Sequence, residues 1–323
     1  MTSIPPAEPK LRLGVSSCLL GAAVRYNGGH SRDEFLARSL DPWVEWLPIC
    51  PEVEIGLGTP RETIHLTGSI QAPRLVAPKS GRDLTYDMQS WARERVEQIA
   101  AARLHGYVLK KGSPSCGLFR VRVYDERGMA QTQGRGLFAT ILAERLPLLP
   151  LEEEGRLHDP ALRENFLERA FTMRRFERLL DEDPTLDGLL RFHADHKLAL
   201  MAHSPRGATG LGRLLATSLG QSFGALSREY ASGMNAALRT LATRGRHANV
   251  LEHLLGFLKG SLDRDDRVEV VESIRQYRLS WVALPVPMAL MRHHLRRTGA
   301  APWALRQVYL SPYPEGLALR NAL

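Results

Sequence analysis

Leu11–Gly21 reads LRLGVSSCLLG, an apolar run typical of a buried strand followed by a turn that carries a cysteine. The other two cysteines have the same setting: Cys50 follows the run Val44–Ile49, and Cys116 follows Gly106–Leu109. The carboxyl ends of neighbouring parallel strands meet at one edge of a sheet. Three such strands would therefore bring three thiols to one point, where thiolates can hold an iron–sulfur cluster and leave one iron open.

A different interpretation of the cysteines has to be weighed. A few scattered cysteines are most often small buried apolar residues. The chain has no C-x-x-C pair, so the compact zinc and ferredoxin patterns are absent, and an odd number of cysteines does not favour a disulfide framework. The proline, glycine and serine residues around each thiol favour a ligand role, because backbone N–H groups in turns can donate to thiolates.

Strands and helices alternate in the first half of the chain. This pattern predicts an α/β domain with a parallel sheet in a Rossmann-like, three-layer arrangement. The strands are expected at about 11–17, 44–50 and 106–110, with short extended pieces in 56–87 and at 119–125. The helices are expected from Ser31, with Ser31 as the cap, over Leu84–Leu104 and over about Leu137–Leu146.

A segment with two prolines, three glutamates and a glycine, Pro147–Gly155, marks a domain boundary. We therefore predict one domain over residues 1–150 and a second over 156–323. Nearly all of the second domain has helical periodicity, which predicts an all-α domain. Its helices are expected at 160–181, 184–203, 208–219, 221–243, 246–260, 263–280 and 285–298.

The positive charge of the chain is unevenly distributed. Of the 323 residues, 1–155 contain 19 Lys+Arg against 18 Asp+Glu, whereas 156–323 contain 24 against 17. A basic half joined to a nearly neutral half suggests a module that grips nucleic acid beside one that does chemistry, although an ordinary basic surface explains it as well. No apolar stretch is long enough to span a membrane, and residues 1–10 resemble a short disordered arm without a signal-peptide core. We expect a cytoplasmic protein.

Five motifs in sequence order resemble the thiouracil desulfidase family, over about residues 10–155. They are CLLG from Cys18, RYNGGH from Arg25, CPEV from Cys50, SPSCG from Ser113 and GRGLF from Gly134. Asn27 stands where many relatives have aspartate. The stretch His193–Pro205 resembles a second, uncharacterised helical family. The fusion of the two is similar to the tRNA 4-thiouridine desulfidases, in which the helical partner is thought to hold tRNA.

The resemblance implies the chemistry of the site. Cys18, Cys50 and Cys116 would ligate a [4Fe–4S] cluster whose fourth iron takes the sulfur of the substrate as a Lewis acid, without electron transfer. Glu52 is the candidate general acid/base, or else only the cap of the following turn. Ser113 is the second candidate, for positioning water, relaying a proton or hydrogen-bonding the base.

Basic residues are the remaining candidates for substrate and RNA contacts. Lys110 and Lys111 would hold a substrate phosphate or balance the cluster charge, while Arg25 and His30 would shape the pocket or only brace a turn. Arginine clusters would hold the phosphates of thiolated tRNA, with Trp281 and Trp303 for stacking, or else form a solvated surface. The candidate arginines are Arg174, Arg175, Arg244, Arg246, Arg292, Arg296 and Arg297. The helical motif contains His193, His196 and His203, for which a structural or RNA-contact role is favoured over a metal site.

Three competing functions stay open at this level. The same chemistry would serve free thiouracil or a thionucleotide. A cluster-bearing sensor that binds nucleic acid would need no turnover. The reverse reaction, thiolation, would need a sulfur source and usually an activated base, and the chain has no G-x-x-x-x-G-K-[ST] loop for a nucleotide phosphate. Neither a membrane nor an obligate protein partner is indicated.

Overall fold

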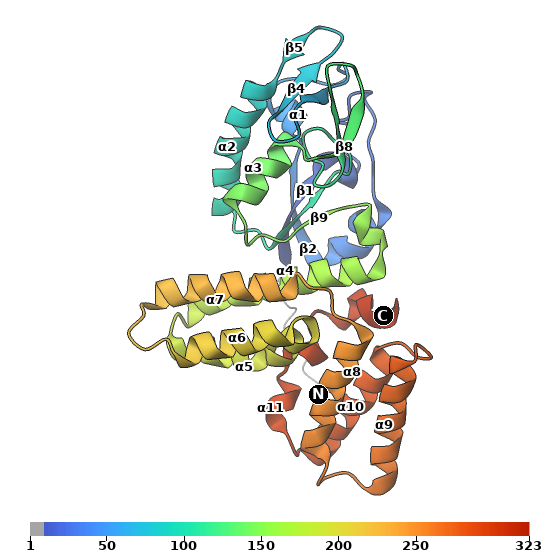
Figure 1. The fold of residues 1–323 in the computed structure, drawn as a ribbon. Coiled ribbons are helices and arrows are strands. Elements are labelled where there is room, and N and C mark those ends of the chain that lie inside the picture. The colour runs from blue at the N-terminus through green and yellow to red at the C-terminus, as the bar shows by residue number, and fades with distance from the viewer. Residues whose placement is uncertain (1–9, 323) are drawn as a thin grey trace. The chain divides into compact units, whose positions relative to one another are not determined.

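The structure, a computed structural model, describes residues 10–322. The chain divides into two units: the first ends at Asp159 and the second begins at Pro160. Figure 1 shows strands with helices in the first unit and helices alone in the second, as the sequence predicts. The arm expected over residues 1–10 lies outside the described residues, apart from Lys10.

Four parallel strands form the predicted sheet of the first unit, in the order β2-β1-β6-β9. Their bounds are Leu11–Ser16 (β1), Val44–Ile49 (β2), Gly106–Leu109 (β6) and Leu151–Glu153 (β9). β1 pairs along its whole length with β2, from Leu11↔Val44 to Ser16↔Ile49, so the two strands end at the same level. Gly14 faces Tyr107 on β6, and the aromatic ring occupies the space of a Cβ atom there.

A second, mixed sheet has the strand order β5-β4-β3-β7-β8. The sequence predicted only short extended pieces here, not a sheet. Its strands span His65–Gly68 (β3), Pro73–Ala77 (β4), Arg82–Asp83 (β5), Val121–Tyr124 (β7) and Ala130–Gly134 (β8). β3 pairs with β7 in register Leu66↔Val123, so residues far apart in the sequence meet in this sheet.

Two helices, α2 (Thr85–Ala101) and α3 (Leu137–Arg145), lie side by side against the core. The buried face of α2 carries Met88, Ala92, Val96 and Ile99, whose spacing is helical. They join strand residues such as Tyr107 in one apolar cluster. Short helical turns, η1 (Ser17–Leu20) and η3 (Asp41–Trp43), contact β2.

The helix expected to begin at Ser31 is different in the structure. A π-helical segment, η2, spans Phe35–Leu40, and Asp33 is its capping side chain: Asp33 Oδ1 accepts a hydrogen bond from the backbone N–H of Leu36 at 3.0 Å. Ser31 was therefore the wrong cap, because the chain is still hydrogen-bonded to η1 at Ser31 and Asp33, through the carbonyl oxygens of Cys18 and Leu19, and the helix begins only after Asp33.

The second unit contains eight α-helices among its described residues. They are α4 (Pro160–Glu182), α5 (Leu186–His203), α6 (Pro205–Ala216), α7 (Phe223–Leu238), α8 (Arg244–Leu258), α9 (Arg264–Arg278), α10 (Pro285–Thr298) and α11 (Pro302–Leu305). The start of α6 was predicted three residues too late, because Ser204 accepts from the N–H of Gly207 and caps the helix before Pro205. Between residues 10 and 322 there is no helix whose length and apolar character would let it span a membrane.

Candidate active site

The three cysteines lie at the carboxyl ends of three adjacent strands, β2, β1 and β6. Cys18 belongs to the turn η1 after β1, Cys50 is the N-cap residue of the short helix α1 (Pro51–Glu54) after β2, and Cys116 lies in the loop after β6. All three line one cavity of about 230 Å³. The convergence expected from the strand ends is therefore found.

Burial dominates the protonation of these thiols, none of which is in a disulfide. It raises the pKa of Cys18 to about 11, against the opposing charge of Lys110, and it raises the pKa of Cys50 and of Cys116 as well. Donors next to two of the sulfurs favour the thiolate. Backbone N–H groups at the start of α1 lower the pKa of Cys50, and a hydrogen bond with Ser16 lowers that of Cys116.

The chemistry of the donor set fits an iron–sulfur cluster. Among residues 10–322, no three His, Cys, Asp or Glu side chains come together as the ligands of a single metal ion would. A [4Fe–4S] cluster binds each cysteine through a different iron atom, so its ligands stand around a larger group. Three uncharged thiols around one cavity become thiolates when a cation stabilises them.

Glu52 lies two residues after Cys50, in the first turn of α1, and lines the same cavity. Its Oε1 accepts from the hydroxyl of Ser115 at 3.1 Å and is 3.4 Å from the hydroxyl oxygen of Ser113. Ser113 Oγ also accepts from the backbone N–H groups of Ser115 and Cys116, at 3.2 and 3.1 Å. The two catalytic candidates from the sequence are thus neighbours in one hydrogen-bonded group.

The basic candidates of this unit divide into two groups. Arg25, Lys110 and Lys111 line the cavity, and the ammonium group of Lys110 forms an ion pair with Glu154. His30 is not part of the cavity lining; its Nδ1 accepts from the backbone N–H of Arg32 at 3.2 Å. This hydrogen bond is local, between residues two apart in the sequence, and the role of His30 stays a prediction.

Two contributors to the site were missed in the sequence. Arg61 lines the cavity and forms an ion pair with Glu52. Ser115, which lies within the SPSCG motif, donates to the same carboxylate. The segment Gly58–Arg61 offered one signal, an arginine after a glycine and a proline in a turn, but nothing local connects it with Glu52.

Several predicted RNA-binding arginines are engaged within the helical unit. Arg244 donates to the carbonyl oxygen of Tyr277 at 3.2 Å and lies over its ring, and Arg246 donates to that of His203 at 2.7 Å. Arg174 and Arg175 lie over the ring of Phe171, 5.2 and 6.0 Å from its centroid. These four guanidinium groups contribute to the packing of the unit.

The last cluster lines a surface groove of about 530 Å³ on α10, formed by Arg292, His293, Arg296 and Arg297 together with Ala289 and Glu315. Arg292 forms an ion pair with Glu315, and Arg297 with Asp266. Arg296 is exposed and takes part in none of the ion pairs found among residues 10–322. Of the predicted stacking residues, Trp281 is exposed beneath Arg275, while Trp303 packs against Phe257.

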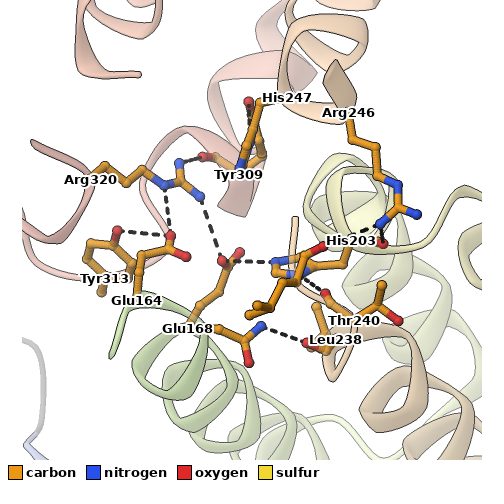
Figure 2. A network of polar contacts seen from close by, with 12 residues as sticks. Glu164, Glu168, His203, Leu238, Thr240, Arg246, His247, Tyr309, Tyr313 and Arg320 are labelled. Atoms are coloured by element: carbon orange, nitrogen blue, oxygen red, sulfur yellow. Dashed lines mark hydrogen bonds and ion pairs between the residues drawn. The ribbon is translucent and has the colours of Figure 1, made fainter. Parts of the chain in front are cut away.

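The histidines of the helical motif have protein partners. His193 Nδ1 is 3.1 Å from the hydroxyl oxygen of Tyr230, and His196 Nδ1 is 2.7 Å from the carbonyl oxygen of Phe192. His203 is buried between the carbonyl oxygen of Thr240 and the carboxylate of Glu168 (Figure 2). These contacts give the motif a structural role in the helical unit.

Comparison with known protein families divides the chain at a similar place. Residues 13–154 match the family model described as 2-thiouracil desulfurase. Residues 197–314 match a second model, described as a protein of unknown function (DUF1722). The first match contains all three cysteines, Glu52 and Ser113.

Individual relatives follow the same pattern. The chain is 32% identical over 108 residues to the uncharacterized protein YbbK of Bacillus subtilis, covering 32% of this chain and 71% of that one. It is 26% identical over 155 residues to the uncharacterized protein YbgA of Escherichia coli, covering 48% and 91%. Among solved structures, the [4Fe–4S]-dependent thiouracil desulfidase TudS is 30% identical, with 46% of this chain and 95% of that chain covered and a TM-score of 0.38.

Proposed function

Because the chain belongs to the 2-thiouracil desulfurase family, we propose that it is a [4Fe–4S]-dependent desulfidase acting on 4-thiouridine in tRNA. The reaction is a hydrolysis: water adds to the thiocarbonyl carbon, the carbon–sulfur bond breaks, and uridine and hydrosulfide leave. No electron is transferred, so the reaction requires no oxidant or reductant.

One observation carries the proposal. Three thiols and a carboxylate from separate segments of the first unit line a single cavity of about 230 Å³. The thiols are the donor type that iron–sulfur clusters use. The carboxylate is the group that a hydrolysis needs to move protons.

A bound cluster would supply a Lewis-acidic iron that polarises the C=S bond of the substrate. The residues of the chain do the rest. Glu52 Oε1 is the oxygen that would accept a proton from the attacking water, and the hydroxyls of Ser113 and Ser115 hold that oxygen in place. Ser113 also ties the carboxylate to the backbone N–H of Cys116, so the base and a ligand are positioned together.

The size of the cavity supports a base as the reacting group. Cys18 and Cys116 are buried at its walls, and a folded RNA cannot enter such a space. A thiolated uridine inside a tRNA would have to be turned out of its stack, as other base-modifying enzymes require. Arg25 and Lys111 line the cavity and would meet the phosphates that flank such a base.

The helical unit supports RNA as the larger substrate. The positive excess of the chain lies almost entirely in residues 156–323. Arg296 and its neighbours on α10 line the groove described above, and a cationic groove attracts a phosphate backbone.

The test uses the full chain, reconstituted anaerobically with iron and sulfide. Thiolated tRNA and free 4-thiouracil are offered separately, and the loss of 4-thio absorbance and the release of hydrosulfide are followed. We expect turnover of the tRNA that the Cys116→Ala variant abolishes. Turnover of the free base alone would replace tRNA by a salvage substrate. No turnover of either by cluster-loaded protein would refute the desulfidase and favour a sensor.

The RNA part of the proposal has its own control. The variant Arg296→Glu reverses a charge in the groove of α10. It should weaken the binding of thiolated tRNA and reduce the slope of log affinity against log salt concentration by about 1. The matched substitution is Arg206→Glu, at an exposed arginine of α6. Equal effects of the two variants would assign the binding to general charge rather than to this groove.

A further inference from the structure

Arg61 lies in the loop between α1 and β3, and its side chain turns back to Glu52. The ion pair is nearly dry: the side chains of Arg61 and Glu52 are 5% and 16% exposed. A buried arginine needs partners for its donors, and their geometry decides what it holds in place.

The guanidinium group is fixed on two sides. Its Nε donates to Glu52 Oε2 at 3.2 Å, and Nη2 donates to the same oxygen. Its Nη1 donates to the carbonyl oxygen of Gly58 at 2.8 Å and to the hydroxyl of Thr59 at 3.4 Å. The backbone N–H of Arg61 donates to the carbonyl oxygen of Tyr26 at 2.8 Å, which fixes the start of the side chain.

The two oxygens of Glu52 are thereby distinguished. Oε2 is taken by Arg61, whereas Oε1 faces Ser113 and Ser115. A partial rotation of the carboxylate plane would break both sets of contacts, so the plane is held in one orientation with one oxygen toward Ser113 and Ser115. We infer that Arg61 is a positioning residue for the desulfidase reaction, which holds the Glu52 carboxylate so that Oε1 serves as the proton-transferring atom. This inference rests on the function proposed above and assigns a role to a residue outside the motifs that suggested it.

The planar fork is essential to this role. Nε and Nη2 reach one oxygen together, and lysine offers only a point charge on a flexible stem. A lysine should therefore restore the charge beside Glu52 but not its orientation. A residue that only braced the loop Gly58–Thr59 would instead depend little on whether Glu52 is present.

The first measurement compares steady-state kinetics of cluster-loaded full chain. Arg61→Met should lower kcat about 100-fold, the lower range for loss of a positioned acid/base group, with KM changed less than about twofold. Arg61→Lys should recover part of kcat. The control is Arg74→Met, at an arginine that is 63% exposed and 3.4 Å from Asp83, and it should leave kcat unchanged. Cluster absorbance and iron content should match the wild type in all variants.

A double-mutant cycle separates positioning from bracing. In a Glu52→Gln background, Arg61→Met should have almost no further effect on kcat, because both residues act through the same carboxylate. An equal loss of kcat with and without Glu52 would overturn the inference.

The same four proteins are also compared by the unfolding temperature of the cluster-free full chain. Arg61→Met should lower this temperature more in the background that contains Glu52 than in the Glu52→Gln background, because only the former is left with a largely buried carboxylate that has lost its cationic partner. Additive shifts would overturn the inference as well. A wild type without turnover would refute the proposed function, and the unfolding cycle would still decide whether Arg61 acts on Glu52.

Discussion

Arg320 joins the last turn of the helical unit to its first helix, and its replacement should be costly. Its Nε donates to Glu164 Oε1 on α4 at 3.0 Å, and its Nη1 donates to the carbonyl oxygen of Tyr309 at 2.6 Å (Figure 2). The hydroxyl of Tyr313 donates to the same carboxylate oxygen at 3.1 Å. The side chains of Arg320 and Glu164 are only 7% and 4% exposed.

The expected cost follows from this burial. Removing one partner of a buried ion pair leaves an uncompensated charge and costs about 3–5 kcal/mol. Methionine in place of Arg320 fills much of the same volume, so most of this cost comes from the carboxylate. Burial, and then the charge of Glu168, raise the pKa of Glu164, so the unpaired group would be driven toward its neutral form.

Hydrogen exchange of backbone amides, followed by mass spectrometry in the native full chain, measures this cost locally. Arg320→Met should reduce the protection of the α4 amides by about 3–5 kcal/mol. The control is Arg306→Met, at a 65% exposed residue 3.7 Å from Asp195, and it should change this protection by less than about 1 kcal/mol. Adding Glu164→Gln should recover most of the loss, because the glutamine carries no charge and because Glu168, which is 3.8 Å from Arg320, keeps His203 as its partner. A cost for Arg320→Met no larger than that for Arg306→Met, or no recovery by Glu164→Gln, would refute the reasoning.

Three further outcomes are expected. Burial holds the pKa of His196 at about 3, whereas an unfolded imidazole titrates near 6.5. The free energy of unfolding of the wild type should therefore fall as the pH drops from about 6.5 toward 3, by up to about 1.4 kcal/mol per pH unit. In urea unfolding, His196→Phe should remove that part of the pH dependence. A Cβ at Gly136 would overlap the carbonyl group of Ser115, so Gly136→Ala should displace the adjoining cysteine loop and lower the iron bound after reconstitution, with unfolding of the helical unit unchanged. Ser113→Ala should reduce kcat more than Ser115→Ala, because Ser113 bonds to Glu52 and also accepts two backbone N–H groups; equal losses would contradict this.

The elements with regular periodicity were predictable from the sequence. α2 was expected over residues 84–104 and spans Thr85–Ala101, because its apolar residues repeat at the helical interval. The second sheet was not predicted. Its strands have two to five residues, and pairs such as Leu66↔Val123 join segments more than 50 residues apart. No local sequence pattern therefore predicts these strands.

The same division explains what could be known of the site. Each cysteine is marked in the sequence by a strand followed by a turn. Because β2, β1 and β6 are parallel neighbours, the three cysteines that follow them line one cavity. Arg61 carries no such signal: its position depends on a loop whose backbone is tied to Tyr26, on a different segment of the unit. Groups that donate to a cluster or attack a substrate are marked by their residue type, but groups that orient them are marked only by contacts. The orientation of Glu52, rather than its presence, is therefore what the structure adds to the sequence.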